Sequence, residues 1–337
     1  MRRRPVTTAV VGCGSWGRNH VRNFARLSDL RVCCDEDRER LAAVGETHPD
    51  VRTTPDYDGV LADEEVEAVV IVTPSDRHAD MAVRALQADK HVFVEKPLAL
   101  SVEDAERVVE AAERVDRVLM VGHIMEYHPG VVEIKSLLDG GELGETCYLY
   151  SQRVNLGTVR TDETALWSLA PHDVSMMNWL VGAGPEEVAA HGTSYLRPGI
   201  EDVVFLYLRY PDGVVGHVHV SWLDPHKERT LTVVGDRKMA VFDDMSPSEK
   251  VRVYDKGADV ERGMTVGHTA PEIYLRDGDV VIPALEKTEP LAREVDEFLR
   301  CVEEGDEPRS DGRDGLRVVR VLERAQRALD EERRAGE

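Results

Sequence analysis

The chain has 337 residues, of which 42% are hydrophobic and 31% charged, and its formal net charge at pH 7 is −22. A chain of this length is longer than those that usually fold around one hydrophobic core, so we expect two domains, at residues 1–123 and 124–337. Nucleic acids and anionic membrane surfaces bind clustered Lys and Arg, so the acidic balance disfavours both as partners.

The sequence also favours a cytoplasmic protein. Aliphatic runs such as Val69–Val72 are far shorter than the roughly 20 residues that a membrane-spanning helix needs. A β-like segment, Val6–Val11, follows the basic start directly, without the apolar region of a secretory signal. The 5 cysteines are odd in number and form no CxxC pair, so we expect neither a disulfide framework nor a zinc site built from them.

From Val6 to about Val121, short aliphatic runs alternate with amphipathic stretches. This alternation predicts parallel strands buried on both faces, with helices between them, which is the doubly wound α/β Rossmann arrangement. The expected strands are 8–12, 30–34, 68–73, 91–94 and 118–121, and the expected helices are 17–27, 36–46, 76–89 and 102–115.

Past Tyr127 the pattern changes to alternating strands joined by short turns. We expect an α+β domain with a large, mostly antiparallel open sheet. Because an uncovered sheet invites pairing with a second subunit, we also expect a homodimer or homotetramer. The expected strands are 146–155, 203–210, 214–222, 230–235 and 238–243, and the expected helices are 166–181, 289–304 and 313–333.

A GxGxxG motif stands at the end of the first strand. Gly12 allows the tight turn, Gly14 lets the backbone approach a pyrophosphate, and Gly17 lets the helix pack closely on the strand. Ser15 and Trp16 complete the loop, whose free N–H groups at the helix start would bind phosphates. The motif predicts a dinucleotide site.

An acidic residue in the expected position strengthens this prediction. Asp35 ends the second strand, where a carboxylate accepts hydrogen bonds from the adenosine ribose diol. The run Asp35-Glu36-Asp37 would repel a 2′-phosphate, so NAD is favoured over NADP, although Arg38 is a nearby cation.

Glu95-Lys96-Pro97 follows the 91–94 strand and therefore lies at the carboxyl edge of the sheet, where open α/β folds bind ligands. A lysine there could hydrogen-bond a substrate hydroxyl and the nicotinamide ribose. From its position alone, an exposed charge after a strand is an equally good interpretation of Lys96.

His123, Glu126 and His128 form an H-x-x-E-x-H pattern. Its spacing differs from the helical HExxH of zinc enzymes, and the following Pro129-Gly130 favours a loop. We therefore expect no metal site.

Several further motifs accompany the glycine motif: Thr73-Pro74 with His78, Glu95-Lys96-Pro97, Gly122-His123 and His172-Asp173. Together these motifs resemble those of the Gfo/Idh/MocA family of oxidoreductases. The resemblance covers nearly the whole chain. The segments Arg153–Gly157, Ala165–Trp167 and Leu169–Asp173 further resemble the branch that oxidises the 3-hydroxyl of UDP-N-acetylated sugars.

The resemblance implies roles for individual residues. Lys96 matches the lysine that contacts the reacting hydroxyl, and His172 matches the proposed general base. The implied cofactor-binding residues beyond the glycine loop and Asp35 are Thr73, Pro74, His78, Glu95 and Lys96. The implied substrate-binding residues are Lys96, His123, Tyr127, Arg153, Asn155, Trp167, Ser168 and His172.

Two positions depart from the family pattern. Ser168 stands one helical turn before His172, where an aspartate is common, and it cannot supply that negative charge. Asp173 is a candidate to replace the missing carboxylate. Thr164 stands where the UDP-sugar branch would have an amide residue.

The leading hypothesis is an NAD-dependent dehydrogenase that oxidises a secondary hydroxyl, at C3, of a UDP-N-acetylated sugar. One alternative is a dehydrogenase of an unactivated sugar or cyclitol. Another is a catalytically silent NAD-binding regulatory protein whose proton relay has decayed at Ser168.

Overall fold

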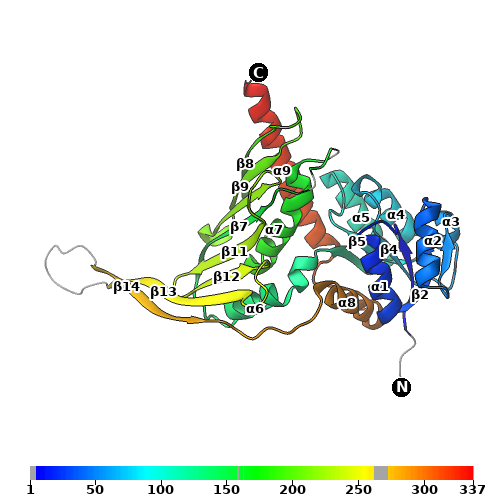
Figure 1. The fold of residues 1–337 in the computed structure, drawn as a ribbon, viewed down its shortest axis with the longest axis horizontal. Helices are drawn as coiled ribbons and strands as arrows, with labels where there is room; N and C mark the ends of the chain where they lie inside the picture. Colours follow the sequence, from blue (N-terminus) through cyan, green and yellow to red (C-terminus); the bar gives the residue numbers. More distant parts are fainter. Residues whose placement is uncertain (1–4, 158, 162, 262–271, 337) are drawn as a thin grey trace. The chain divides into compact units, whose positions relative to one another are not determined.

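The computed structural model describes residues 5–157, 159–161, 163–261 and 272–336, which form two compact units (Figure 1). The first unit is Met1–Tyr127 with Thr288–Glu323, and the second is His128–Lys287 with Arg324–Glu337. The predicted second domain, 124–337, thus differs from the packing units, since Thr288–Glu323 groups with the first unit. The reason is the apolar face of one helix in that segment, which joins the first unit's core through Leu291, Val295 and Phe298.

A six-stranded parallel sheet forms the centre of the first unit, in the order β3-β2-β1-β4-β5-β6. This is the Rossmann order, with the change of direction between β1 and β4. The doubly wound fold predicted from the sequence is confirmed. The strands are β1 (Thr7–Val11), β2 (Asp29–Cys34), β3 (Arg52–Thr54), β4 (Ala68–Ile71), β5 (His91–Glu95) and β6 (Leu119–Gly122).

Helices cover both faces of this sheet because alternate strand residues point to opposite sides. Val69 and Val92 pack in the core beneath α4 and α5. Val70 and Phe93 pack on the other side, in the core formed with α8 and with Phe24 of α1. The helices are α1 (Gly17–Leu27), α2 (Arg38–Thr47), α3 (Tyr57–Leu61), α4 (His78–Gln87), α5 (Val102–Val115), α8 (Pro290–Glu304) and the start of α9 (Gly312–Gly336), with 3-10 turns η1 (Ser75–Arg77) and η2 (Ile124–Tyr127).

An eight-stranded sheet forms the second unit, in the order β14-β13-β12-β11-β7-β10-β9-β8. Among the described strand pairs of this second sheet, only β7–β10 is parallel, so the predicted, mostly antiparallel sheet is confirmed. The strands are β7 (Thr146–Val154), β8 (Glu187–Thr193), β9 (Val203–Arg209), β10 (Val215–Ser221), β11 (Glu228–Gly235), β12 (Met239–Asp243), β13 (Val251–Glu261) and β14 (Glu272–Val281), with a 3-10 turn η3 (Pro211–Gly213).

One face of this sheet carries α6 (Pro129–Asp139) and α7 (Ala165–Val181), which lie on the same side of the strands in Figure 1. On β9 the burial alternates along the strand, with Val204, Leu206 and Leu208 buried and Phe205 and Tyr207 exposed. The sheet is therefore covered on one face by the helices of its own unit.

The interpretation of Pro129-Gly130 as a loop is wrong. Pro129 occupies the first turn of α6, where its missing N–H costs nothing, and the His128 side chain accepts a hydrogen bond from Gly130 N at 3.0 Å. Among the described α-helices and strands, six were not predicted: β3, α3, α6, β8, β13 and β14.

Among the described residues, no helix is both long and apolar enough to cross a membrane.

Candidate active site

The glycine loop between β1 and α1 is shaped as a phosphate site requires. Gly12 has φ +98°, and an added Cβ there would lie 2.4 Å from the Val72 carbonyl oxygen. At Gly17 a Cβ would lie 1.9 Å from the Gly12 carbonyl oxygen, so only glycine lets α1 begin this close to β1. At Gly14 a Cβ would instead make only an ordinary contact, with the Arg40 guanidinium at 3.7 Å. These features fit a bound pyrophosphate, which would approach the chain over Gly14.

No side chain caps the first turn of α1, which Trp16 precedes. Arg18 N–H donates to the Gly14 carbonyl oxygen at 3.1 Å and Asn19 N–H donates to that of Trp16 at 2.9 Å, while the helix dipole at this end favours an anion. Ser15 and Trp16 are both exposed at this end of the helix.

Asp35 lies beside this loop at the end of β2. Its Oδ2 accepts a hydrogen bond from Cys13 N at 2.7 Å, and its Oδ1 accepts one from Asp37 N at 2.8 Å. Arg40 approaches Oδ2 to 3.6 Å from the first turn of α2. The carboxylate thus orients the glycine loop and is placed where a Rossmann fold holds the adenosine ribose.

Thr73, Pro74 and His78 follow β4 at the same edge of the sheet. The ring nitrogens of His78 lie 2.7 Å from the Pro97 carbonyl oxygen and 2.8 Å from that of Thr73. Burial lowers the pKa of His78, so the neutral ring donates to one of the two carbonyls at a time. His78 therefore joins the loop after β4 to the loop after β5, whereas Pro74 is exposed.

Glu95 ends β5 and is held by two aromatic donors from α1 and its cap. Trp16 Nε1 donates to Glu95 Oε1 at 2.5 Å, and His20 Nε2 lies 2.7 Å from the same oxygen. Burial alone would raise the pKa of Glu95, but the hydrogen bonds from His20 and Trp16 outweigh it and the pKa is lowered. The carboxylate also accepts the Lys96 N–H at 3.1 Å, which fixes the backbone of the half-buried Lys96.

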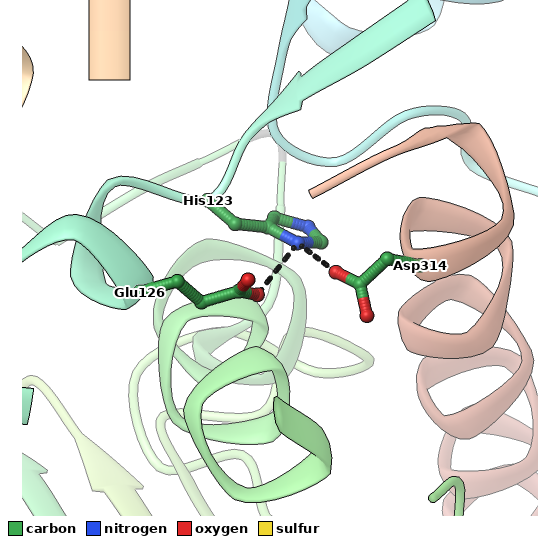
Figure 2. A group of neighbouring side chains, drawn as sticks. All are labelled: His123, Glu126 and Asp314. Atoms are coloured by element: carbon green, nitrogen blue, oxygen red, sulfur yellow. Dashed lines mark hydrogen bonds and ion pairs between the residues drawn. The ribbon is translucent and has the colours of Figure 1, made fainter. Parts of the chain in front are cut away.

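His123 and Glu126 come together after β6, but with Asp314 rather than with His128 (Figure 2). His123 Nδ1 lies 2.8 Å from Asp314 Oδ2 and 3.3 Å from Glu126 Oε1. Burial would lower the pKa of His123, but both carboxylates raise it to about 9. Burial and the charge of Asp314 raise the pKa of Glu126 to about 8.

Tyr127 and His128 have other partners. The Tyr127 hydroxyl lies 3.1 Å from Ser310 Oγ inside the first unit. His128 belongs to the second unit, where its Nε2 lies 3.5 Å from Asp244 Oδ1. Tyr127 and His123 are both buried, and their partners Ser310 and Asp314 belong to the first unit.

In the second unit, Arg153 of β7 binds Asp173 of α7. Arg153 Nε donates to Asp173 Oδ2 at 2.6 Å, and both side chains are buried. Asp173 therefore neutralises Arg153, which argues against the expectation that it replaces the missing carboxylate beside His172. The sequence pattern did not indicate this pair, because its partners lie on separate elements.

The first turns of α7 carry the remaining predicted residues. Thr164 caps the helix by accepting the Trp167 N–H at 3.4 Å, which accounts for a hydroxyl residue at this position. Ser168 and His172 are half-buried and lie one helical turn apart. The Trp167 indole donates to Gln326 Oε1 at 3.2 Å, a contact with α9 that sequence analysis did not predict.

Asn155 follows β7 and is half-buried. Its side chain lies under Gly157, where an added Cβ would be 2.4 Å from Asn155 Nδ2. Gly157 therefore leaves the space that the Asn155 amide uses.

The first unit has the features of a dinucleotide-binding oxidoreductase. They are a parallel sheet in Rossmann order, a glycine loop with an acidic partner, and a lysine at the carboxyl edge of the sheet. Residues 6–123 match the model of the GFO_IDH_MocA oxidoreductase family with an NAD-binding Rossmann fold, and residues 131–241 match the GFO/IDH/MocA C-terminal domain. The chain belongs to the Gfo/Idh/MocA oxidoreductase family, as its motifs predicted.

Curated relatives include two kinds of dehydrogenase. The UDP-N-acetylglucosamine 3-dehydrogenase of Acidithiobacillus ferrooxidans is 29% identical over 93% of this chain and 94% of its own length. Inositol 2-dehydrogenase of Salmonella typhimurium is 34% identical over 52% of this chain and 54% of its own length. The solved structure of the Acidithiobacillus ferrooxidans enzyme matches with a TM-score of 0.82 and 28% identity, covering 96% of this chain and 98% of that one.

Proposed function

We propose that the protein is an NAD-dependent dehydrogenase that oxidises a secondary hydroxyl, at C3, of a UDP-N-acetylated sugar. The observation that carries this proposal is the likeness to the UDP-N-acetylglucosamine 3-dehydrogenase, which extends over both units in sequence and fold. The segment Leu169–Asp173 on α7, which prompted the resemblance to that branch, supports it.

We assign the cofactor phosphates to the loop Gly12–Gly17 and the adenosine ribose diol to Asp35. Thr73, Pro74, Glu95 and Lys96 border the nicotinamide end in this proposal, with His78 holding their loops in place. Bound NAD supplies the hydride acceptor for the oxidation.

Lys96 and His172 carry the proton chemistry of the proposal. The Lys96 ammonium stabilises the oxygen of the reacting hydroxyl as negative charge develops on it. The His172 imidazole takes the hydroxyl proton as general base. Ser168, one turn away, supplies a hydroxyl dipole and no charge, so imidazolium formation at His172 gains no ion pair from this position.

Among the other predicted substrate-binding residues, we assign direct contacts to Asn155, Trp167 and Ser168, which are half-buried. Arg153 acts through its buried pair with Asp173, the residue next to His172. The enclosed His123 and Tyr127 support the loop after β6 rather than touch the sugar.

Turnover with a sugar panel tests the proposal. The purified protein is mixed with NAD and separate UDP-sugars, and NADH formation is followed by absorbance. We expect oxidation of a UDP-N-acetylated hexosamine, and loss of at least a thousandfold in kcat for Lys96→Ala and His172→Ala with NAD binding retained. Absence of turnover with every nucleotide sugar would refute the substrate assignment, and activity in both variants would refute the mechanism.

A second candidate is a dehydrogenase of an unactivated sugar or cyclitol, which the 34% identity to inositol 2-dehydrogenase favours. UDP distinguishes the two candidates. A nucleotide-sugar site binds UDP in competition with substrate, whereas a cyclitol site has no group that recognises it. A silent NAD-binding regulatory protein would bind NAD but oxidise neither class.

A further inference from the structure

His123, Glu126 and Asp314 place one imidazole nitrogen and two carboxylates around one point in the first unit. His123 follows β6, Glu126 lies in η2, and Asp314 lies in the first turn of α9, 191 residues from His123. Their ligand-type atoms all lie within 4.8 Å of one another. In Figure 2, both carboxylates point at the same nitrogen, Nδ1 of His123.

This cluster is closed to solvent. His123 is 1% exposed, Glu126 0% and Asp314 3%. Within the described chain, neither carboxylate oxygen of Glu126 accepts a hydrogen bond, although the side chain is fully buried and aimed at His123. A buried carboxylate in this state is costly unless something else compensates it.

The two carboxylates of the cluster differ in their arginine partners. Arg317 Nη2 donates to Asp314 Oδ1 at 2.9 Å, so one carboxylate oxygen already has a cationic partner. Among the described residues, the Glu126 side chain has no arginine partner of this kind. Its ion-pair neighbour is His123, at 3.3 Å, and the nearby Arg309 donates to its backbone carbonyl at 2.5 Å. Glu294, a further fully buried carboxyl group, lies on α8, and its pKa is raised by burial and then by the charges of Glu95 and Glu126.

We propose that His123, Glu126 and Asp314 form a divalent metal site that takes Zn²⁺. A tetrahedral zinc ion with bonds of about 2.0 to 2.1 Å separates its ligand atoms by about 3.3 Å. The observed separations from His123 Nδ1 are 2.8 Å and 3.3 Å, and all the ligand-type atoms lie within 4.8 Å of one another, so an ion would draw the two carboxylates together around itself. A mixed set of imidazole and carboxylate ligands suits zinc, whereas Mg²⁺ and Ca²⁺ prefer oxygen alone.

The ion would have a structural role. It would tie the turn after β6 to the first turn of α9, two segments that sequence keeps far apart. It would also compensate the buried Glu126 carboxylate, with Arg317 hydrogen-bonded to the outer oxygen of Asp314 as a supporting partner. This inference is independent of the proposed dehydrogenase function.

Metal content tests the site directly. The full-length protein is purified without a metal-affinity step, dialysed against buffer with about 50 µM ZnCl₂, which saturates a structural zinc site, and then desalted. Zinc is measured by mass spectrometry, and the thermal midpoint is measured with and without a strong chelator. We expect about one zinc per chain and a lower midpoint after chelation, because binding to the folded state alone stabilises it.

Three substitutions assign the ligands. Glu126→Gln and Asp314→Asn keep side-chain volume and are expected to lower retained zinc at least tenfold, as is His123→Ala. His191→Ala is the matched control, since His191 forms an exposed pair with Glu332 at 3.1 Å outside the cluster. It should retain the full zinc content.

Cobalt substitution covers the case in which a variant fails to fold. Co²⁺ added to the metal-free protein is expected to give visible d–d absorption bands that ZnCl₂ displaces. A metal-free protein that takes up neither ion would overturn the proposal, leaving a cluster held together by a proton alone. Equal zinc in His123→Ala and the parent would also overturn it, because the metal would then bind elsewhere.

Discussion

Arg153 and Asp173 form a buried ion pair, 2.6 Å between Nε and Oδ2, that joins β7 to α7 next to His172. The side chains are 7% and 1% exposed, so neither charge is compensated by water. The pair fixes the helix that carries Ser168 and His172 against the central strand of the second sheet.

Asp173→Asn should therefore destabilise the protein by about 3 to 5 kcal/mol, because it leaves the Arg153 guanidinium buried without its partner. Urea unfolding measures this loss. We also expect kcat to fall at least tenfold, since His172 is the adjacent residue. Glu187→Gln is the control: it breaks a surface pair with Arg209 and should change stability by less than about 1 kcal/mol. Equal effects of the two substitutions would contradict the structural role of the buried pair.

The sequence predicted the first unit well because its signals are local. The glycines at 12, 14 and 17 and the acid at 35 lie within one βαβ unit, and the structure joins them through the Cys13–Asp35 hydrogen bond. Strands buried on both faces are continuous aliphatic runs, which are easily recognised. The short β3 and α3 lack such runs and were missed.

Contacts between distant segments could not be predicted in the same way. No spacing rule connects His123 with Asp314 or Arg153 with Asp173, because these pairs form only when separate elements pack. The strands β8 and β13 were missed for a different reason. β8 contains Ala and Gly, and β13 contains several charged residues, so neither has the typical composition of a strand.

Asp35 is expected to set the choice between NAD and NADP. Asp35→Ser should lower kcat/KM for NAD at least tenfold and raise the ratio of kcat/KM for NADP to that for NAD, because the repulsion of a 2′-phosphate by Asp35 is lost. Arg40, whose Nε lies 3.2 Å from Asp37 Oδ2, remains nearby as a cation that can attract this phosphate. Initial rates with both cofactors measure the ratio.

Asp58→Asn is the matched control, since its exposed carboxylate pairs with Arg84 of α4 rather than with the glycine loop. It should leave the ratio within about twofold. An unchanged ratio in Asp35→Ser would show that the carboxylate does not select the cofactor.

His91 is expected to make folding sensitive to acid. Burial, aided by the charge of Arg117, lowers its pKa to about 4, and its Nδ1 accepts the Val118 N–H at 3.1 Å. In the unfolded state the pKa of His91 is about 6.5, so between pH 6.5 and 4 the unfolded chain binds more protons at His91 than the folded protein does. Stability from the neutral ring is therefore present above about pH 6.5 and is lost as the pH falls toward 4.

Because His91 is only half-buried, we expect this loss to be about 1 to 2 kcal/mol between pH 7 and 4.5. Urea unfolding at the two pH values measures it. His91→Gln removes the titrating ring and should reduce the difference by that amount. An identical pH dependence in His91→Gln and the parent would refute the assignment to His91.

The outer face of the second sheet is expected to form a homodimer or homotetramer. Tyr148, Tyr150, Phe205 and Tyr207 are each 40% to 45% exposed on this face. Light scattering should give a mass of at least two chains for the parent. Tyr150→Asp with Phe205→Asp should give one chain, because two buried charges would oppose the contact. Tyr195, which lies outside the strands, is 70% exposed, and Tyr195→Asp is the control that should leave the mass unchanged. A parent protein with the mass of one chain would contradict the expectation.

Ser168→Asp tests whether the missing carboxylate matters for His172. A carboxylate one turn before His172 stabilises the protonated imidazole, so a higher pH is needed to generate the base. We therefore expect the acid limb of the kcat/KM profile to move to higher pH by about 0.5 to 1 unit. Ser168→Ala, which adds no charge, should keep the acid limb in place while lowering kcat/KM through loss of the hydroxyl. A profile that is the same in Ser168→Asp and Ser168→Ala would show that the acid limb does not report on His172.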